Sequence, residues 1–275
     1  MSQGKNTNLW IRIGTTVVLG PLLLLLLFAG PAWGWSLLIA LSAAQGTLEL
    51  VTMSHPGDRV SQGWGALSAF LIAGSLVCPT NDAPLFLTAL CAVILVSAIL
   101  PLFRLGDIKT AALRILGGIA APIYVGLFLG TLALLRAEQG DRGPYFVLLT
   151  LTIAWMGDTG GYTFGRLWGK TPLYPAVSPK KTREGLLGSV VFAVLSALLA
   201  SLTYLPELPI VGAVALGVSG ALLGQAGDLV ESLLKRSFGT KDSGSILPGH
   251  GGLLDRIDAL LVVGPLVYVY TLWLG

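Results

Sequence analysis

Charged residues are scarce in this chain of 275 residues. Asp, Glu, Lys and Arg together make up 11% of it, whereas an ordinary soluble domain contains roughly 25%. So few charges cannot cover the surface of a water-soluble globule of this size, and that class of protein is excluded. Hydrophobic residues make up 54% and the mean hydropathy is +0.79. We therefore expect an all-α integral membrane protein whose helices face lipid or one another.

Cysteine is also rare. Cys78 and Cys91 are the two cysteines, and neither belongs to a CxxC pair or a Cys/His cluster. The sequence thus indicates no disulfide framework and no zinc site, and we interpret both as small apolar side chains. The formal net charge of +3 says little until the positions of the charges are considered.

Long uncharged runs predict nine membrane-spanning helices, each needing about 20 apolar residues. The first run, 13–48, contains two of them, since Gly30 followed by Pro31 does not continue a helix. It is longer than the apolar part of a signal peptide and lacks a convincing cleavage site, so we expect it to be uncleaved. The other runs are 60–81, 83–103, 115–135, 143–157, 185–206, 208–227 and 259–275.

The positions of the basic residues predict the orientation. With the N-terminus in the cytoplasm, nine crossings leave only Arg136 and Arg142 of the 17 Lys and Arg residues outside, as the positive-inside rule requires. The two longest polar segments, 158–184 and 228–258, then face the cytoplasm. We expect residues 1–144 to shape a cavity and residues 145–275 to carry a cytoplasmic site.

The first polar cluster closes the eighth predicted helix. Asp228, Glu231 and Ser232 share one helical face through their i, i+3 and i+4 spacing, and Lys235 and Arg236 follow. Carboxylates at the end of a membrane helix are costly and usually functional; the alternative is that they only solvate the helix end. The Gly220 and Gly224 spacing earlier in this helix is typical of close helix packing.

The second cluster is a loop, 241–258, that is rich in glycine, lysine and acids. Glycines let backbone amides approach phosphate oxygens, a helix N-terminus adds positive potential, and carboxylates hold magnesium. The loop therefore indicates a nucleotide phosphate site, the alternative being a charged loop with a helix cap. His250 is either a general base or a hydrogen-bonding anchor of the loop, and His55 is interpreted as a turn residue.

The third cluster begins with Asp158, followed by Gly160 and Gly161, at the predicted membrane edge of the sixth helix. The segment 178–185 then brings Lys180 and Lys181 together with hydroxyl groups. Such a segment suits a triphosphate or an anionic lipid headgroup. Positive loops beside the membrane also serve as topology signals, and this alternative stays open.

Taken together, these residues resemble a known signature, that of the phosphatidate cytidylyltransferases, also called CDP-diacylglycerol synthases. Its pattern is matched by Ser232-x-x-Lys235-Arg236-x4-Lys241-Asp242-x-Gly244-x3-Pro248-x-His250-Gly251-Gly252-x-x-Asp255-Arg256-x-Asp258. The segments 158–161 and 178–185 are similar to the same family, so the resemblance covers the chain from about Trp155 onward. Ala259 departs from it, at a position where a small hydroxyl or glycine is more usual.

The resemblance implies transfer of a cytidylyl group from CTP to phosphatidic acid, giving CDP-diacylglycerol and pyrophosphate. It implies Mg²⁺ dependence, with Asp228 and Asp255 as metal ligands and a second cation nearby. The remaining catalytic positions would be Lys241, Asp242, His250, Arg256 and Asp258. Substrate-binding positions would be Asp158, Ser178, Lys180, Lys181, Thr182, Glu184, Ser232, Lys235, Arg236, Gly251 and Gly252.

The expected setting is the inner membrane of a bacterium, with CTP and membrane lipid as partners and no nucleic acid; a homodimer stays open. Two other functions are considered. A CTP-dependent lipid or polyprenol kinase would transfer the γ-phosphoryl group and release CDP. An ion-coupled transporter would carry its acids in the middle of helices, where only Glu49 interrupts an apolar run. The DGxxAR pattern of CDP-alcohol phosphotransferases is missing from the sequence.

Overall fold

The computed structural model describes residues 3–78, 83–104, 106–246 and 251–273. They form two compact units. The N-terminal unit comprises Met1–Ala133 and Asp242–Arg256, and the C-terminal unit comprises Leu134–Lys241 and Ile257–Gly275. The loop that carries Asp255 thus belongs to the N-terminal unit, although it lies late in the sequence. The functional division between residues 144 and 145 stays a prediction.

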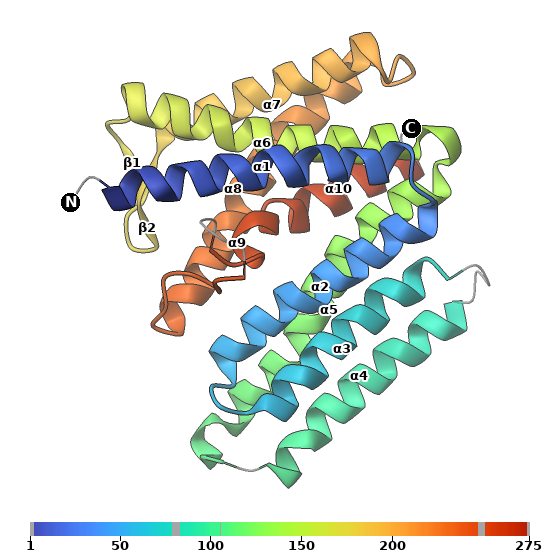
Figure 1. Ribbon diagram of the computed structural model, residues 1–275, viewed down its shortest axis with the longest axis vertical. Coiled ribbons are helices and arrows are strands. Elements are labelled where there is room, and N and C mark those ends of the chain that lie inside the picture. The colour runs from blue at the N-terminus through green and yellow to red at the C-terminus, as the bar shows by residue number, and fades with distance from the viewer. Residues whose placement is uncertain (1–2, 79–82, 105, 247–250, 274–275) are drawn as a thin grey trace. The chain divides into compact units, whose positions relative to one another are not determined.

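The N-terminal unit is built from helices (Figure 1). α2 packs on α1 and α3, and α3 packs on α4. α5 crosses α3 closely, because a Cβ atom at Gly126 would meet the carbonyl oxygen of Ala69 at 2.9 Å. The helices are α1 (Gln3–Phe28), α2 (Ala32–Ser54), α3 (Arg59–Leu76), α4 (Ala83–Phe103), the 3₁₀ turn η1 (Ile108–Thr110), most of α5 (Ala111–Glu138) and most of the short α9 (Leu254–Ile257).

The C-terminal unit is a second helical group in which α6 and α7 make the most extensive contact. A Cβ atom at Gly188 would meet Cβ of Phe164 and the carbonyl oxygen of Gly160, each at 2.5 Å, so glycine permits this close approach. The elements are η2 (Gly140–Arg142), α6 (Gly143–Trp168), β1 (Pro172–Tyr174), β2 (Ser178–Thr182), α7 (Arg183–Thr203), α8 (Ile210–Ser237) and α10 (Leu260–Trp273).

Each of the nine predicted spans corresponds to a helix, and the predicted break at Gly30 and Pro31 is confirmed, since α2 begins directly after Pro31. In the described part of the chain, six helices are long and apolar enough to cross a membrane: Ala32–Ser54, Ala83–Phe103, Ile108–Glu138, Arg183–Thr203, Ile210–Ser237 and Leu254–Trp273. α3 and α6 are not among them, and α1 contributes only a shorter apolar stretch, Val17–Phe28. Nine crossings and a cytoplasmic N-terminus therefore stay predictions.

Two helices continue past the apolar runs that predicted them. α6 extends to Trp168 and α8 to Ser237, so Asp158 lies within α6, and Asp228 lies within α8, as its helical spacing with Glu231 predicts. Hydropathy reports which residues tolerate lipid, whereas helix continuation depends on backbone geometry, and the polar residues after both apolar runs are compatible with a helix. The all-α expectation also omits a small antiparallel hairpin, in which β1 pairs with β2.

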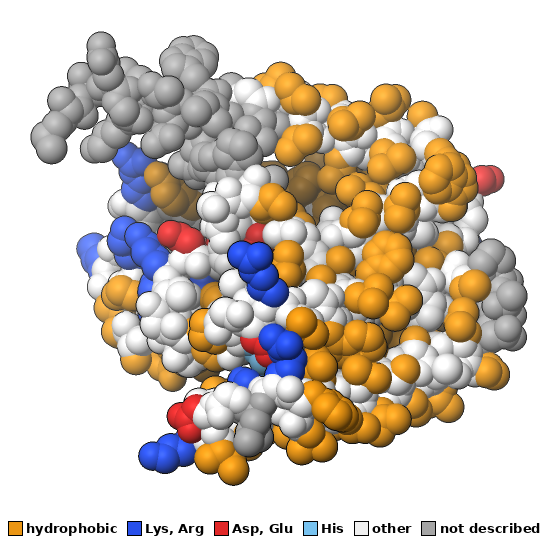
Figure 2. Space-filling model, turned by 60° about the horizontal axis from the view of Figure 1, so that its bottom comes forward, with side chains coloured by type: hydrophobic (Ala, Val, Ile, Leu, Met, Phe, Trp, Pro, Cys, Tyr) orange, Lys and Arg blue, Asp and Glu red, His pale blue; other side chains and the backbone are white. Residues whose placement is uncertain are grey.

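Many apolar side chains of these helices face outward, as contact with lipid requires. In α4, the buried residues are Val93, Ser97 and Pro101, while Leu87, Leu95 and others are largely exposed. Figure 2 shows a face of the molecule on which hydrophobic side chains predominate. The apolar exterior and the six long helices identify a membrane protein.

Candidate functional site

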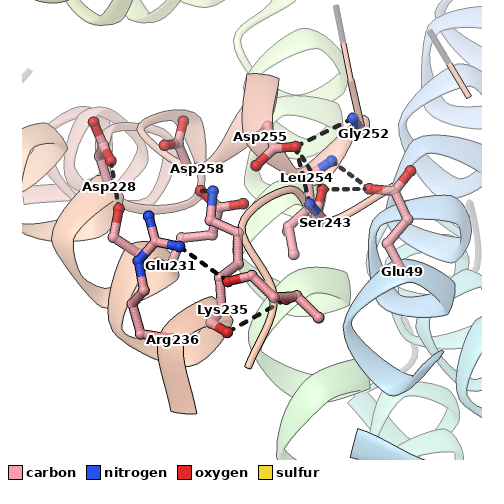
Figure 3. Close-up of polar contacts among 12 residues, drawn as sticks. Glu49, Asp228, Glu231, Lys235, Arg236, Ser243, Gly252, Leu254, Asp255 and Asp258 are labelled. Atoms are coloured by element: carbon pink, nitrogen blue, oxygen red, sulfur yellow. Dashed lines mark hydrogen bonds and ion pairs between the residues drawn. The ribbon is translucent and has the colours of Figure 1, made fainter. Parts of the chain in front are cut away.

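An acidic cluster forms in the C-terminal unit from two turns of α8 and the first residue after α9. Asp228, Glu231 and Asp258 each offer one carboxylate oxygen, and these oxygens lie within 4.8 Å of one another (Figure 3). Two ligands of one Mg²⁺ ion lie at most about 4.2 Å apart, since each bond is about 2.1 Å long. Small side-chain rotations would therefore allow this hard oxygen set to hold a divalent cation.

The cluster depends on helical spacing and on one glycine. Asp228 and Glu231 lie three residues apart on α8, and Ser232 Oγ donates a hydrogen bond of 3.3 Å to Asp228 Oδ1. A Cβ atom at Gly227 would meet the carbonyl oxygen of Asp258 at 2.9 Å. Glycine at 227 therefore lets the segment carrying Asp258 approach α8, which places the third carboxylate beside the other two.

Gly220, earlier on α8, confirms the prediction of close packing, whereas an added methyl group at Gly224 would make only ordinary contacts. A Cβ atom at Gly220 would meet Cγ2 of Ile153 at 2.6 Å, and one at Gly224 would meet Cγ2 of Val263 at 3.6 Å. α8 thus packs on α6 and α10 through its small residues.

Two lysines offset part of the negative charge of the cluster. Lys181 Nζ, from β2, lies 2.6 Å from Asp228 Oδ2. Lys235 Nζ, one turn after Glu231, lies 3.0 Å from Glu231 Oε2 and is itself buried. Opposite charges at these distances reduce the repulsion among the carboxylates. The structure thereby brings together four residues from two predicted clusters, 178–185 and 228–236, with Asp258.

Several predicted substrate-binding residues stabilise the hairpin and the helix ends. Glu184 Oε2 accepts hydrogen bonds from the amides of Lys170 (3.1 Å) and Thr171 (3.2 Å). Thr182 Oγ1 accepts one from the Gly185 amide at 3.1 Å, which caps α7. Arg236 Nη1 donates to the carbonyl oxygen of Thr240 at 3.1 Å. These contacts establish structural roles; substrate binding by these residues stays a prediction.

A small cavity lies among α6, α7 and α8 of the C-terminal unit. Its polar lining includes Asp158, Ser189 and Gln225, and most of its other lining residues are small, among them Gly157 and Ala221. Asp158 is exposed on α6. The cavity accordingly places this predicted binding residue beside open space within the same unit as the acidic cluster.

A second polar arrangement lies in the N-terminal unit, where Asp255 organises the glycine-rich loop. Asp255 Oδ2 accepts hydrogen bonds from Ser243 Oγ (2.9 Å), the Ser243 amide (3.1 Å) and the Gly252 amide (3.1 Å). Gly251 has φ of +83°, a conformation that favours glycine. The backbone turn and the carboxylate together hold both ends of the loop near the start of α9.

Glu49 of α2 also contacts this loop. This contact was not predicted from the sequence. Its carboxylate accepts hydrogen bonds from Ser243 Oγ, the Leu253 amide and the Leu254 amide, at 2.9 to 3.0 Å (Figure 3). The available signal is a single carboxylate within an apolar run, one helical turn after Gln45, and this position by itself favours only an ion-carrying group.

The other predicted site residues are placed as follows. Asp228 and Asp255 belong to different units, so their joint binding of a metal stays a prediction. His250 lies outside the described residues. Ser178, Gly251 and Ser232 are half-buried, Gly252 is buried, and the exposed positions are Lys180, Lys241, Asp242 and Arg256.

The turn between α2 and α3 is a separate structural feature. His55 ends α2 as predicted for a turn residue, and its carbonyl oxygen accepts the Asp58 amide at 3.2 Å. Asp58 caps α3 through the Ser61 amide and pairs with Arg104 Nε at 2.9 Å. Burial raises the pKa of Asp58, but the hydrogen bonds from Ser61 and Arg104 outweigh it, so the pKa is lowered from its ordinary value.

The chain is similar to known proteins at the level of a family and of individual relatives. A family model described as "Cytidylyltransferase family" matches residues 10–274. Similar relatives are the phosphatidate cytidylyltransferases of Staphylococcus epidermidis (43% identical over 132 residues), Staphylococcus aureus (43% over 134) and Staphylococcus saprophyticus (41% over 132). Each alignment covers 48% of this chain and 51% of the relative. The chain thus spans about half the length of the curated relatives it matches.

Proposed function

The chain belongs to the cytidylyltransferase family, and on this premise we propose that it is a phosphatidate cytidylyltransferase of the membrane. It transfers the cytidylyl group of CTP to phosphatidic acid and produces CDP-diacylglycerol and pyrophosphate. The observation that carries the proposal is the cluster of Asp228, Glu231 and Asp258, flanked by Lys181 and Lys235. This arrangement suits phosphates and a divalent cation better than it suits an apolar ligand.

The reaction needs no nucleophile from the protein. A phosphate oxygen of phosphatidic acid attacks the α-phosphorus of CTP, and the bond from that phosphorus to the β-phosphate oxygen breaks, so pyrophosphate leaves with the electron pair. Both reactants are polyanions, and their repulsion is the main obstacle. Catalysis of such a phosphoryl-group displacement is chiefly positioning and charge neutralisation.

The roles of the residues follow from that requirement. Asp228 would hold Mg²⁺, with Glu231 and Asp258 beside it and Asp255 as the further ligand that the family resemblance assigns. When bound, Mg²⁺ supplies positive charge to the triphosphate and the leaving pyrophosphate; a second cation would assist. Lys181, Lys241 and Arg256 bind phosphate oxygens through charge-assisted hydrogen bonds.

The membrane setting explains how the two substrates meet. The apolar helices place the protein in the bilayer, where phosphatidic acid enters sideways with its acyl chains in hydrocarbon. CTP arrives from water, so the site lies at the membrane boundary. We propose that this boundary is the cytoplasmic face of a bacterial inner membrane, with the N-terminus on the same side, because the positive-inside rule supports it.

The test is a product assay on the purified protein in lipid nanodiscs that contain phosphatidic acid. We expect α-³²P-labelled CTP to label the lipid and pyrophosphate to be released, both only with Mg²⁺. Asp228→Asn should abolish labelling. Glu138→Gln is the matched control, because Glu138 is a carboxylate of the C-terminal unit that accepts a hydrogen bond from the Tyr268 hydroxyl, away from the acidic cluster.

The same assay distinguishes the two other functions. Lipid labelled by γ-³²P-CTP but not by α-³²P-CTP would show a kinase and overturn the proposal. Labelling by neither nucleotide would also overturn it and would favour the transporter.

A further inference from the structure

Glu49 is the one charged residue between Arg12 and Asp58 in the sequence, and it lies within the membrane-spanning helix α2. Its side chain is buried, with 5% of the residue exposed. A buried carboxylate is strongly unfavourable unless hydrogen-bond donors compensate for the lost water. The buried carboxylate of Glu49 therefore needs hydrogen-bond donors from the groups that contact it.

Four donors contact this carboxylate. One is Gln45 Nε2, from the preceding turn of α2, at 3.1 Å. The other three come from the loop of residues 242–254: Ser243 Oγ at 3.0 Å, the Leu253 amide at 3.0 Å and the Leu254 amide at 2.9 Å. A single side chain thus holds both ends of a loop that lies about 200 residues later in the chain, as Figure 3 shows.

Two glycines of the loop fit against the Glu49 carboxylate. A Cβ atom at Gly244 would meet Glu49 Oε1 at 2.8 Å, and a Cβ atom at Gly252 would meet Glu49 Oε2 at 2.6 Å. Neither glycine has a positive φ, in contrast to Gly251. Glycine at 244 is thus required by the space that Glu49 occupies, and glycine at 252 by the space that Ser243 and Glu49 occupy, and neither by backbone conformation.

Ser243 links Glu49 to Asp255. Its hydroxyl oxygen lies 3.0 Å from Glu49 Oε2 and 2.9 Å from Asp255 Oδ2. A hydroxyl has one proton, so Ser243 donates to one of the two carboxylates at a time. The amides of Leu253 and Leu254, both bound to Glu49, directly precede Asp255 in the chain. Any displacement of Glu49 would consequently displace Asp255.

We infer that Glu49 is a positioning residue that fastens Ser243, Leu253 and Leu254 to α2 and thereby fixes the orientation of Asp255. The catalytic part of this inference rests on the proposed function, in which Asp255 belongs to the reaction site. The attachment of the loop to Glu49 does not depend on that function and can be measured separately.

Hydrogen–deuterium exchange in nanodiscs measures the attachment. Glu49→Gln keeps the shape of the side chain but replaces an acceptor oxygen with an NH₂ donor. We expect the amides of Leu253 and Leu254 to exchange about tenfold faster in this variant, as the loss of a hydrogen bond of ordinary net strength implies. Peptides from α7 should exchange at wild-type rates. Glu138→Gln, the matched control, should leave the loop peptide unchanged.

Ser243→Ala is a milder second variant, useful if Glu49→Gln does not fold. It removes only the hydroxyl between the two carboxylates, and we expect exchange of the loop peptide to rise about threefold. Unchanged exchange in Glu49→Gln, or in Ser243→Ala where that variant replaces it, would overturn the attachment.

Steady-state kinetics then tests the positioning role. Misplacement of a reacting group by about 1 Å lowers turnover by about 100-fold, so we expect a kcat for Glu49→Gln reduced tenfold to 100-fold, roughly. The KM for CTP should change less than kcat, because the residues that contact Glu49 do not include Lys181, Lys241 or Arg256, which are proposed to bind the phosphates. Faster exchange with wild-type kcat would overturn the positioning role. A wild-type protein without cytidylyl transfer would overturn the proposed function, while faster exchange in the variant would still support the attachment.

Discussion

Lys181 Nζ lies 2.6 Å from Asp228 Oδ2, which joins a hairpin strand to the acidic face of α8. The lysine side chain is 18% exposed and the aspartate side chain 33% exposed, so water screens the pair only in part. Lys181 therefore pairs with Asp228 Oδ2, an oxygen for which a divalent cation bound by Asp228 would compete. The two proposed roles of this lysine, binding phosphate and neutralising the cluster, lead to opposite effects of its removal.

The first prediction concerns Lys181→Gln. The loss of a charge-assisted phosphate contact should raise the KM for CTP about tenfold. The loss of a competing cation should lower the Mg²⁺ concentration needed for half-maximal thermal stabilisation by about threefold, the factor expected for a partly exposed ion pair. Kinetics and thermal unfolding at graded Mg²⁺ concentrations measure the two effects.

The matched control is Lys170→Gln. Lys170 is exposed, and its backbone amide, not its side chain, donates to Glu184. In this variant the KM for CTP and the Mg²⁺ concentration for half-maximal stabilisation should both stay within a factor of about two of the wild-type values. A Lys181→Gln protein that needs more Mg²⁺ than wild type would show that Lys181 does not compete with the cation.

The second prediction concerns the third carboxylate of the cluster. Asp258→Asn keeps an oxygen near Asp228 and Glu231 but removes a charge. We expect Mg²⁺ affinity to fall by about tenfold or more, so that 1 mM Mg²⁺, which should raise the melting temperature of the wild type, has little effect on the variant. The measurement needs no substrate and is therefore independent of turnover. An unchanged Mg²⁺ response would remove Asp258 from the proposed cation site, and Glu138→Gln again serves as the control carboxylate.

Helical spacing alone was enough to predict that Asp228 and Glu231 share a face, and the acidic cluster confirms it. Asp258 joins them because Gly227 lets its backbone approach α8, a contact that depends on how two helices pack. The pair of Lys181 and Asp228 joins segments that the sequence presents as separate clusters. Long-range contacts of this kind depend on tertiary packing, and local pattern does not report them.

Glu49 is a stronger example of a long-range contact that local sequence pattern does not predict. Its hydrogen bond to Ser243 joins residues 194 positions apart, and the residues around Glu49 predict only a membrane helix. The glycine-rich loop predicts tight backbone approach correctly, but the anion that approaches Gly244 and Gly252 in the structure is a carboxylate of the chain itself. α6 and α8 continue past their apolar runs for a different reason, since loss of apolar character marks the edge of lipid contact and not the end of a helix.

The third prediction concerns pH and the turn before α3. The pKa of Asp58 is lowered in the folded protein, so its stabilising contribution is present above the ordinary pKa of 3.8 and is lost as the pH falls through the lower folded value. Asp58→Ala also removes a helix cap, and we expect it to reduce stability at pH 7 by about 1 kcal/mol. The difference in melting temperature between wild type and variant should be constant from pH 7 to pH 5 and shrink below about pH 4.

Asp107→Ala is the comparison for this effect, because Asp107 accepts a hydrogen bond from the Lys109 amide at 3.0 Å in an exposed 3₁₀ turn. Its effect on stability should be smaller than that of Asp58→Ala. A stability difference for Asp58→Ala that grows as the pH falls below 4 would contradict the direction of the pKa shift.

The last prediction concerns the contact between α6 and α7, which positions Asp158 and the hairpin with Lys181. A Cβ atom at Gly160 would meet the Gly188 backbone and Cβ of Phe192 at 2.8 Å, so Gly160→Ala must push the helices apart. Overpacking of this kind costs about 1–3 kcal/mol, which should lower the melting temperature. Gly63→Ala is the matched control, because the space around Gly63 of α3 is open within 4 Å and alanine favours a helix by up to about 1 kcal/mol. The two substitutions add the same methyl group, so opposite shifts of the melting temperature would assign the effect to the α6 and α7 contact, whereas equal shifts would show that glycine at 160 is not needed for close packing.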